Sequence, residues 1–337
     1  MLVGASAVGA IGTICALALL FFHMDTTILT NPIAVVAPTS FPASKDVAIW
    51  IWKSPEEFSP QEASTTLDQL KEEGFDRIYL EIDGYQKASS SGSAGATAFA
   101  RSLSAFVTAA SARGLAVEGL GGDIDWAQKE NRSIPVNLLA FALAYNKTEP
   151  KEAQLSGMQF DIEAYSLASF ADESEQAPIL TDYLSLADEL ATQVKNSASD
   201  FRLEFAIPFW FDNQTRVLPP ITLNGSQKPV GEHLIDILSG IPGGYVAIMD
   251  YRNTPEGDNG AIARALPLLS YASQAGSTKV VIGLETNNVE PASITFFSKT
   301  KKDLYAVMQE IYDSFKGYRS FEGFAVHDEK GFDQLAP

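Results

Sequence analysis

The sequence is poor in the residues that most often bind transition metals. It has one cysteine, Cys15, and three histidines, His23, His233 and His327, in 337 residues. A zinc site built from cysteine and histidine ligands is therefore not expected. Cys15 lies in an N-terminal hydrophobic run, so a disulfide within the chain is excluded. We expect neither a metal nor any other cofactor.

Positive charge is also scarce. The chain has 24 lysines and arginines against 42 acidic residues, which gives a formal net charge of −18. Nucleic-acid binding depends mainly on cationic side chains that neutralise phosphates, so we expect no nucleic-acid partner. The hydrophobic content of 46% is ample for a large core. No long stretch shows the apolar depletion that is typical of disordered segments.

The longest hydrophobic run opens the chain. No charged residue occurs from Met1 to Phe22, and such a run can cross a ~30 Å hydrocarbon layer as a helix. The cationic start of a signal peptide is missing, although residues 33–37 (Ile-Ala-Val-Val-Ala) offer a small-x-small cleavage site. We expect residues 1–24 to form a transmembrane anchor or a signal, and residues 25–45 to form a linker. The remainder is then membrane-anchored outside the cytoplasm, or secreted.

From residue 46 to residue 337, short β-rich runs alternate with longer amphipathic runs. The predicted strands are 47–52, 77–82, 116–120, 158–162, 203–208, 245–249, 280–284 and 323–327. Ser59 and Glu62 form a capping box around Pro60, which predicts a helix that ends at Gly74. The other predicted helices are 97–113, 135–145, 177–195, 232–238, 261–275 and 301–315.

Eight such βα units without a second run of strands predict one closed (β/α)8 TIM barrel over residues 46–337. An open doubly wound sheet would need a glycine-rich phosphate turn after its first strand. The chain instead has Trp-Lys-Ser-Pro at residues 52–55. This difference favours the barrel.

In such barrels the chemistry lies at the C-terminal ends of the strands. Acids and aromatics gather at these ends here. They include Trp50, Trp52, Glu81, Asp83, Asp123, Asp125, Trp126, Asp161, Glu163, Asp250, Tyr251, Glu285, His327 and Asp328, with Arg252 beside them. Aromatic faces stack on sugar rings, and carboxylates hold hydroxyls and transfer protons to a glycosidic oxygen. The pattern predicts a polysaccharide or oligosaccharide partner.

The fourth predicted strand carries the most specific pattern. Side chains alternate along a strand, so Gln159, Asp161 and Glu163 share one face, and the apolar residues between them share the other. The apolar face should meet the helices, which places both carboxylates inside the barrel. Neighbouring carboxylates repel, and the pKa of one of them rises. We expect Glu163, nearer the mouth, to be the acid and Asp161 to orient it or balance charge.

These strand ends resemble those of the family-18 glycoside hydrolases, the chitinases and their relatives. Residues 160–163 (Phe-Asp-Ile-Glu) resemble the end of that family's acidic strand-4 motif. Residues 249–251 (Met-Asp-Tyr) are similar to its Met-x-Tyr, whose tyrosine helps to position an N-acetyl group. The resemblance implies a TIM barrel, a general acid at Glu163 and a substrate-positioning role for Tyr251.

The chain departs from the family pattern at four positions. Ser156 and Gln159 stand where the strand-4 motif has acids, and Arg252 stands where an acid follows the tyrosine. His327 stands where those enzymes have a tryptophan floor. The sequence therefore looks like an outlying relative, and chitin specificity does not carry over.

Two classes of function follow from these residues. The first is a glycoside hydrolase acting on an extracellular or cell-surface polysaccharide, and the second is a non-catalytic carbohydrate-binding TIM barrel. Two close carboxylates favour the enzyme. A third hypothesis, a hydrolase holding Mg²⁺ or Ca²⁺ through Glu81, Asp123 and Asp125, would use oxygen ligands only. The expected catalytic residues are Glu163, Asp161 and Tyr251, and the expected substrate-binding residues are Trp50, Trp52, Glu81, Asp125, Trp126, Arg252, Glu285, His327 and Asp328.

Overall fold

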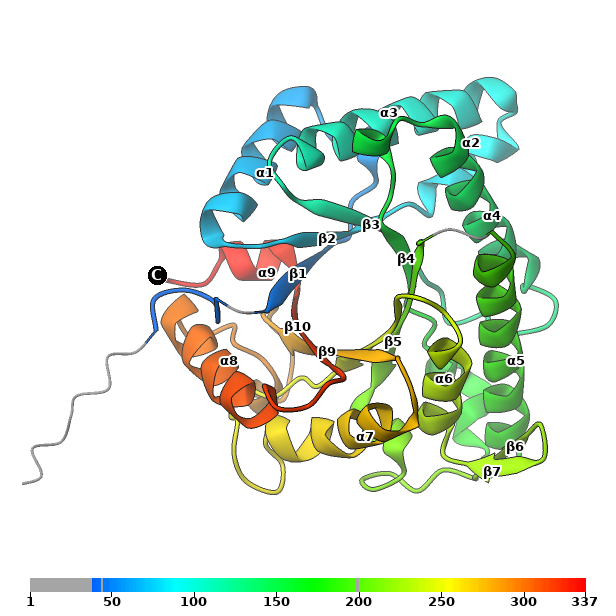
Figure 1. The fold of residues 1–337 in the computed structure, drawn as a ribbon, viewed down its shortest axis with the longest axis vertical. Coiled ribbons are helices and arrows are strands. Elements are labelled where there is room, and N and C mark those ends of the chain that lie inside the picture. The colour runs from blue at the N-terminus through cyan, green and yellow to red at the C-terminus, as the bar shows by residue number, and fades with distance from the viewer. Residues whose placement is uncertain (1–37, 44, 198–199) are drawn as a thin grey trace, which may run out of the picture. The chain divides into compact units, whose positions relative to one another are not determined.

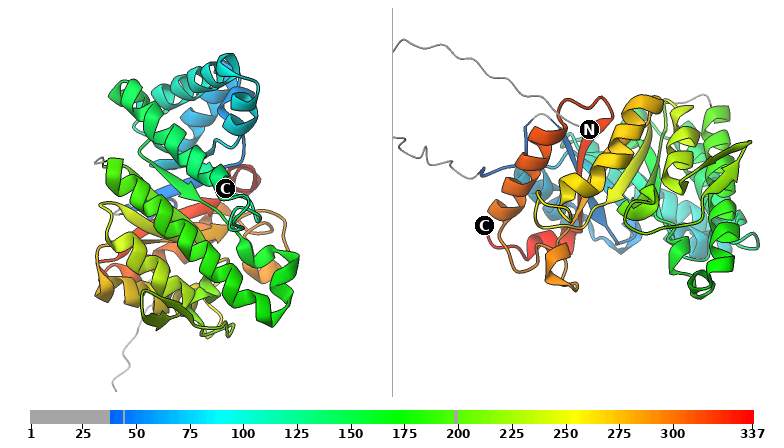
Figure 2. Two further views of the ribbon diagram at one scale, coloured as in Figure 1. Left: turned by 90° about the vertical axis from the view of Figure 1, so that its right-hand side faces the viewer. Right: turned by 90° about the horizontal axis from the view of Figure 1, so that it is seen from below.

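The computed structural model describes residues 38–43, 45–197 and 200–337. The predicted anchor or signal at residues 1–24 lies outside these ranges, as does most of the predicted linker. Within them, no helix has the length and apolar character needed to cross a membrane. A ring of strands surrounded by helices dominates the structure (Figure 1), and two side views show the strands enclosed by those helices (Figure 2).

Eight parallel strands close the barrel in the order β1-β10-β9-β8-β5-β4-β3-β2. They are β1 Asp46–Ile51, β2 Arg77–Glu81, β3 Ala116–Gly121, β4 Gly157–Phe160, β5 Arg202–Pro208, β8 Gly244–Met249, β9 Lys279–Glu285 and β10 Phe321–His327. Each corresponds to one of the eight predicted runs. The prediction of a parallel eight-stranded barrel is confirmed.

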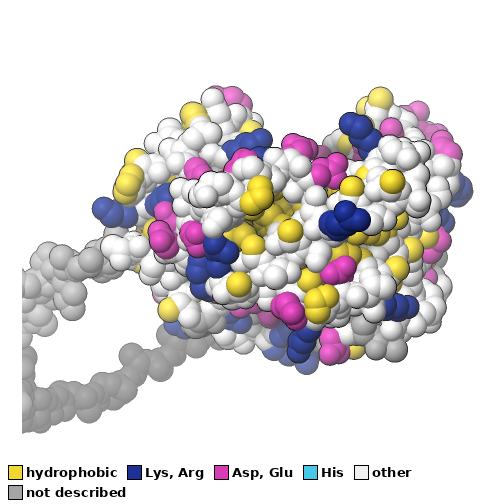
Figure 3. Space-filling model, turned by 90° about the horizontal axis from the view of Figure 1, so that it is seen from above, with side chains coloured by type: hydrophobic (Ala, Val, Ile, Leu, Met, Phe, Trp, Pro, Cys, Tyr) yellow, Lys and Arg dark blue, Asp and Glu magenta, His cyan; other side chains and the backbone are white. Residues whose placement is uncertain are grey.

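In the described ranges, seven helices lie close to their predicted positions, and two short helices, which follow β2 and β10, were not predicted. Together they are α1 Pro60–Glu73, α2 Gly84–Ser90, α3 Ser93–Ser111, α4 Ser133–Thr148, α5 Glu173–Ser197, α6 Val230–Ser239, α7 Ala261–Ala275, α8 Lys301–Phe315 and α9 Glu329–Asp333. At the start of α1, Ser59 accepts a hydrogen bond from the Glu62 amide at 3.2 Å. The helix ends at Gly74, whose φ of 95° suits glycine. On the face over α1 and α3, acidic, basic and apolar side chains are interspersed (Figure 3).

A small two-stranded element was also not predicted. Between β5 and α6 the chain forms a hairpin of β6 Ile221–Leu223 and β7 Ser226–Lys228. Its two turn residues, Asn224 and Gly225, have φ of 51° and 78°. Positive φ at both positions is the geometry that an Asn-Gly pair adopts most readily in a two-residue hairpin.

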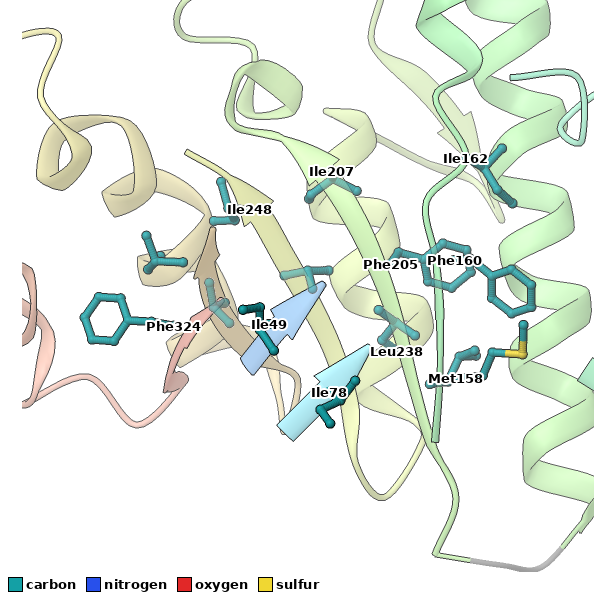
Figure 4. Close-up of a cluster of buried hydrophobic side chains, with 14 of the residues drawn as sticks. Ile49, Ile78, Met158, Phe160, Ile162, Phe205, Ile207, Leu238, Ile248 and Phe324 are labelled. Carbon is teal, nitrogen blue, oxygen red and sulfur yellow. The ribbon is translucent and has the colours of Figure 1, made fainter. Parts of the chain in front are cut away.

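The main core lies between the strands and the helices. Strand residues including Ile49, Ile78, Met158, Phe160 and Ile162 point outward into it (Figure 4). A smaller apolar cluster fills the inside of the barrel, and its members are Ala48, Trp50, Tyr79, Leu120, Tyr245, Ala247, Val281 and Ala325. The alternation of side chains along each strand therefore produces two separate cores.

A group of buried charges lies inside the barrel, near the start of the strands. The Glu118 carboxylate lies 2.9 Å from Arg77 Nε and 2.8 Å from Arg202 Nε. Tyr79 donates a hydrogen bond of 3.0 Å to Glu204. Burial, followed by the charge of Glu118, raises the pKa of Glu204 to about 7. With two acids facing two arginines, the group fills this end of the barrel and leaves the opposite end for a site.

Phe41 lies within the predicted linker, yet it belongs to the barrel domain. Its side chain is only 7% exposed. Its ring lies 4.8 Å from Phe75, 4.9 Å from Tyr305 and 6.1 Å from Phe332, measured between centroids. The packing of the barrel domain therefore begins before residue 46, because an aromatic side chain closes the gap between α1, α8 and α9.

Candidate active site

The end of β4 has the predicted arrangement of faces. Ile162 is 2% exposed and points into the outer core (Figure 4), whereas Gln159 accepts a hydrogen bond from the Trp50 indole inside the barrel. The Asp161 amide donates to Gly121 O at 2.9 Å, so pairing with β3 continues past the strand. A Cβ at Gly122 would lie 2.0 Å from Asp161 O. Glycine is therefore required where the two strand ends meet.

Asp161 is half-buried at the inner side of this strand end. Its Oδ1 atom is buried without a hydrogen-bond partner among the described residues. Burial raises the pKa of Asp161 to about 7, the charge of Glu163 adds to the rise, and His327 opposes it. Near neutral pH this carboxyl therefore keeps its proton for much of the time.

Glu163 begins a short 3-10 turn, Ala164–Ser166, that places two hydroxyls at its carboxylate. The Tyr165 hydroxyl donates a hydrogen bond to Oε1, and the Ser166 hydroxyl lies 3.5 Å from Oε2. Burial, followed by the charge of Glu163, raises the pKa of Tyr165, so the phenol remains a donor. Tyr165 was not predicted. Its only sequence signal is its place two residues after the acid.

The opposite side of the opening holds a chain of hydrogen bonds. Trp52 Nε1 donates to His327 Nε2 at 2.9 Å, and His327 Nδ1 lies 2.8 Å from Glu285 Oε2. Glu285 Oε1 accepts from the amides of Thr286 and Asn287 at 2.8 and 2.6 Å. This network assigns a neutral His327 with its proton on Nδ1. Burial alone would lower the pKa of His327, but its contact with Glu285 raises it.

Tyr251, at the end of β8, lies between the two sides. Its ring centroid is 5.8 Å from that of His327. Burial, followed by the charges of Asp161, Glu285 and Glu163, raises the pKa of Tyr251 well above its ordinary value. The phenol therefore keeps its proton and can donate to a ligand. The carboxylates at the ends of β4 and β9 all raise the pKa of this one phenol, which indicates that these strand ends form one site.

The three predicted tryptophans lie in different environments. Trp50 is 1% exposed inside the barrel, and Trp126 is 4% exposed in the outer core, where its ring lies 6.4 Å from Phe160. Neither has a face open to a sugar ring, because neighbouring side chains cover both, which corrects the expectation of a binding role. Trp52 is half-buried and packs on the inner cluster from the mouth of the barrel.

Of three predicted acids, two accept hydrogen bonds within local structure and one is exposed. Asp328 Oδ1 accepts from the Gly331 amide at 3.0 Å and caps α9. Glu81 Oε1 accepts from the Gly84 amide at 3.0 Å, at the start of α2. Asp125 is exposed in the loop after β3. Across the described ranges, no group of three acids, histidines or cysteines could hold a metal ion, so these acids do not converge as the metal hypothesis requires.

Comparison with known proteins identifies the fold. No family model matches the sequence, and no curated protein matches it. A GH18 chitinase from Pseudoalteromonas aurantia is 12% identical over 86% of this chain and 96% of that chain, with a TM-score of 0.51. GH5_18 from Streptomyces cattleya in complex with GlcNAc is 14% identical over 85% and 70%, with a TM-score of 0.52.

The chain has the (β/α)8 TIM-barrel fold, which these glycoside hydrolases share. It also occurs outside that class. A D-psicose 3-epimerase, in the presence of D-fructose, is 9% identical over 86% of this chain and 90% of that chain, with a TM-score of 0.50. At these identities the likeness concerns the fold alone, and a function must be inferred from the side chains of the site.

Proposed function

We propose that the protein is a glycoside hydrolase that acts on an extracellular or cell-surface polysaccharide, with Glu163 as the general acid. The observation that carries this proposal is the pair of carboxyl groups at the end of β4. Asp161 has a pKa raised to about 7 by burial and by Glu163, so the pair can hold one proton at neutral pH. A glycosidase needs such a proton for the oxygen of the leaving sugar.

Each member of the site has a role in this reaction. Glu163, nearer the mouth, takes up the proton shared with Asp161 and delivers it to the glycosidic oxygen as the bond to the anomeric carbon breaks, which leaves both groups as carboxylates. The hydrogen bond from Tyr165 then stabilises the Glu163 carboxylate. Water completes the hydrolysis, with Asp161 or an acetamido group of the substrate assisting at the anomeric carbon. Tyr251 is placed to donate a hydrogen bond to the substrate.

Trp52 provides the sugar platform in this proposal. Its indole nitrogen is held by His327, and His327 is held by Glu285. A ring fixed in this way loses little conformational freedom when a pyranose stacks on it. Sugar ligands in proteins with the same fold, such as the GlcNAc bound by GH5_18, support a carbohydrate ligand.

The proposed location depends on the sequence. The uncharged run from Met1 to Phe22 supports a membrane anchor or a signal for export. A barrel exported in this way would meet polymers outside the cell, which is why we propose an extracellular or cell-surface polysaccharide.

The experiment is the release of reducing sugar from a panel of polysaccharides. It compares the wild type with Glu163→Gln and with Glu310→Gln, a matched control at an exposed position on α8. We expect release by the wild type and the control from at least one polymer, and none by Glu163→Gln. The alternative, a carbohydrate-binding barrel without catalysis, predicts binding to a polymer without release by any of the three proteins.

A further inference from the structure

Two arginines share one aromatic ring beside the candidate active site. The Arg252 guanidinium lies 4.7 Å from the Phe209 ring centroid, and the Arg264 guanidinium lies 5.5 Å from it. Both arginines also bond to Asn259, with Arg252 Nε donating to Asn259 O at 3.1 Å and Arg264 Nη2 donating to Asn259 Oδ1 at 2.9 Å. The loop between β8 and α7 therefore holds two guanidinium groups close together.

Among the described residues, neither guanidinium forms an ion pair with a carboxylate. In the described part of the chain, the arginines that form ion pairs are Arg77, Arg113, Arg132 and Arg202. Arg252 and Arg264 bond instead to neutral oxygens. Burial lowers the pKa of Arg252, the charge of Asp250 opposes this shift, and the like charge of Arg264 adds to it. An anionic ligand would relieve the repulsion between these like charges.

Two acids, Asp250 and Asp212, interact electrostatically with the pair, but the structure shows an ion pair with neither. The Asp250 side chain is fully buried, and neither carboxyl oxygen has a hydrogen-bond partner among the described residues. Burial raises the pKa of Asp250 well above its ordinary value, although both arginines oppose the rise. An Asp250 carboxyl that keeps its proton does not neutralise the pair, which leaves Asp212 as the acid that partly offsets the charge of Arg264.

The pair adjoins the proposed catalytic residues. Arg252 follows Tyr251 directly and donates a hydrogen bond to its carbonyl oxygen. Phe209 follows the end of β5 and precedes Trp210, whose ring lies 4.9 Å from that of Tyr165. Arg252 is therefore next to Tyr251 in the chain, and the ring that it shares with Arg264 is one residue from Trp210, which contacts Tyr165.

We infer that Arg252 and Arg264 form a subsite for a carboxylate carried by the substrate, so that the polysaccharide contains a uronic acid. This inference rests on the proposed function. The planar guanidinium presents paired N–H donors that match the two oxygens of a carboxylate. Phe209 holds both groups in place through their faces, which leaves edge donors available.

The net charge of −18 limits the conditions under which an acidic polymer binds. A chain with a carboxylate on every sugar would be repelled by the acidic surface at low salt. At physiological ionic strength this repulsion is screened beyond roughly 8 Å, and contacts at the subsite dominate. The net charge therefore limits the binding of an acidic polymer to conditions in which this repulsion is screened.

The experiment measures the binding of D-glucuronate and D-galacturonate against D-glucose and D-galactose by calorimetry at fixed ionic strength. The proteins are the wild type, the double variant Arg252→Gln/Arg264→Gln, and Arg101→Gln as a matched control at an exposed position on α3. We expect the wild type and the control to bind a uronate at least about tenfold more tightly than its neutral counterpart, as a charge-assisted contact predicts. The double variant should lose this preference.

A wild type without preference for either uronate would overturn the inference, as would a double variant that retains the preference. If the glutamine variant fails to fold, the double variant Arg252→Lys/Arg264→Lys keeps the charge and should keep most of the preference. Glu163→Gln distinguishes the two proposals, because it should retain uronate binding. Uronate preference without hydrolysis of any polymer would contradict only the proposed function, and hydrolysis without uronate preference would contradict only the subsite.

Discussion

Replacement of Asp161 by asparagine should stabilise the fold at alkaline pH and leave it almost unchanged at acid pH. In the wild type, burial and the charge of Glu163 raise the pKa of Asp161 from 3.8 to about 7. The unfolded chain releases this proton above about pH 4, whereas the folded chain holds it until about pH 7. The folded state therefore loses stability as the pH rises through this window. Asparagine has no proton to lose.

The magnitude follows from the rise in pKa. A rise from 3.8 to about 7 corresponds to about 4 kcal/mol of unfolding free energy, at ~1.4 kcal/mol for each pH unit. Asp161 is half-buried, so water at the cleft reduces this to about 2 kcal/mol. The variant should gain this amount at pH 8 and almost nothing at pH 4.

The assay is urea denaturation of both proteins at pH 4 and pH 8. Asp188→Asn on α5, an exposed position, is the matched control and should show no pH-dependent difference from the wild type. A difference between Asp161→Asn and the wild type that is equal at the two pH values would refute the assignment of a raised pKa to this carboxyl.

Three further predictions concern packing and the platform. Trp52→Ala should abolish sugar binding, measured by calorimetry, with little loss of stability. Trp50→Ala should lower the unfolding free energy by ~3–5 kcal/mol in urea denaturation, because Trp50 is buried. Loss of sugar binding in Trp50→Ala and loss of stability in Trp52→Ala would contradict the role of Trp52 as the sugar platform. Phe41→Ala should lower the unfolding free energy by ~3 kcal/mol, and an unchanged melting temperature would show that its ring contacts are unimportant. Sugar affinity should fall as the pH drops through the pKa of His327, because a protonated ring cannot accept the hydrogen bond from Trp52. Glu285→Gln should move the midpoint of this loss of affinity to lower pH, since the contact with Glu285 raises the pKa of His327. An unchanged midpoint would exclude the Glu285 contact as the cause of the raised pKa.

The barrel could be predicted because each of its units carries a local signal. A strand in such a barrel is a short apolar run, and α7 and α8 begin and end at their predicted residues because their apolar pattern and flanking residues agree. The hairpin of β6 and β7 also has a local signal, the Asn224-Gly225 turn, but its strands are too short for periodicity to reveal them.

The site was predicted less completely because periodicity gives the face of a strand and not the depth along the barrel. Trp50 and Trp52 share a face, but about 7 Å of strand separates them, so one is covered and the other lies at the mouth. Tyr165 reaches Glu163 through a short turn that has no repeating pattern. The pairing of Arg252 with Arg264 depends on contacts between a loop and a helix, which spacing does not encode.

The most direct test of the proposed hydrolase measures turnover and binding of Glu163→Gln on the same polysaccharide. A general acid contributes roughly 10²–10⁴-fold to the rate, so kcat should fall by at least about 100-fold. The dissociation constant should change by less than about threefold, because the amide keeps the shape of the side chain. Glu310→Gln should match the wild type in both. A kcat for Glu163→Gln within a few-fold of the wild type would contradict the assignment of Glu163 as the general acid.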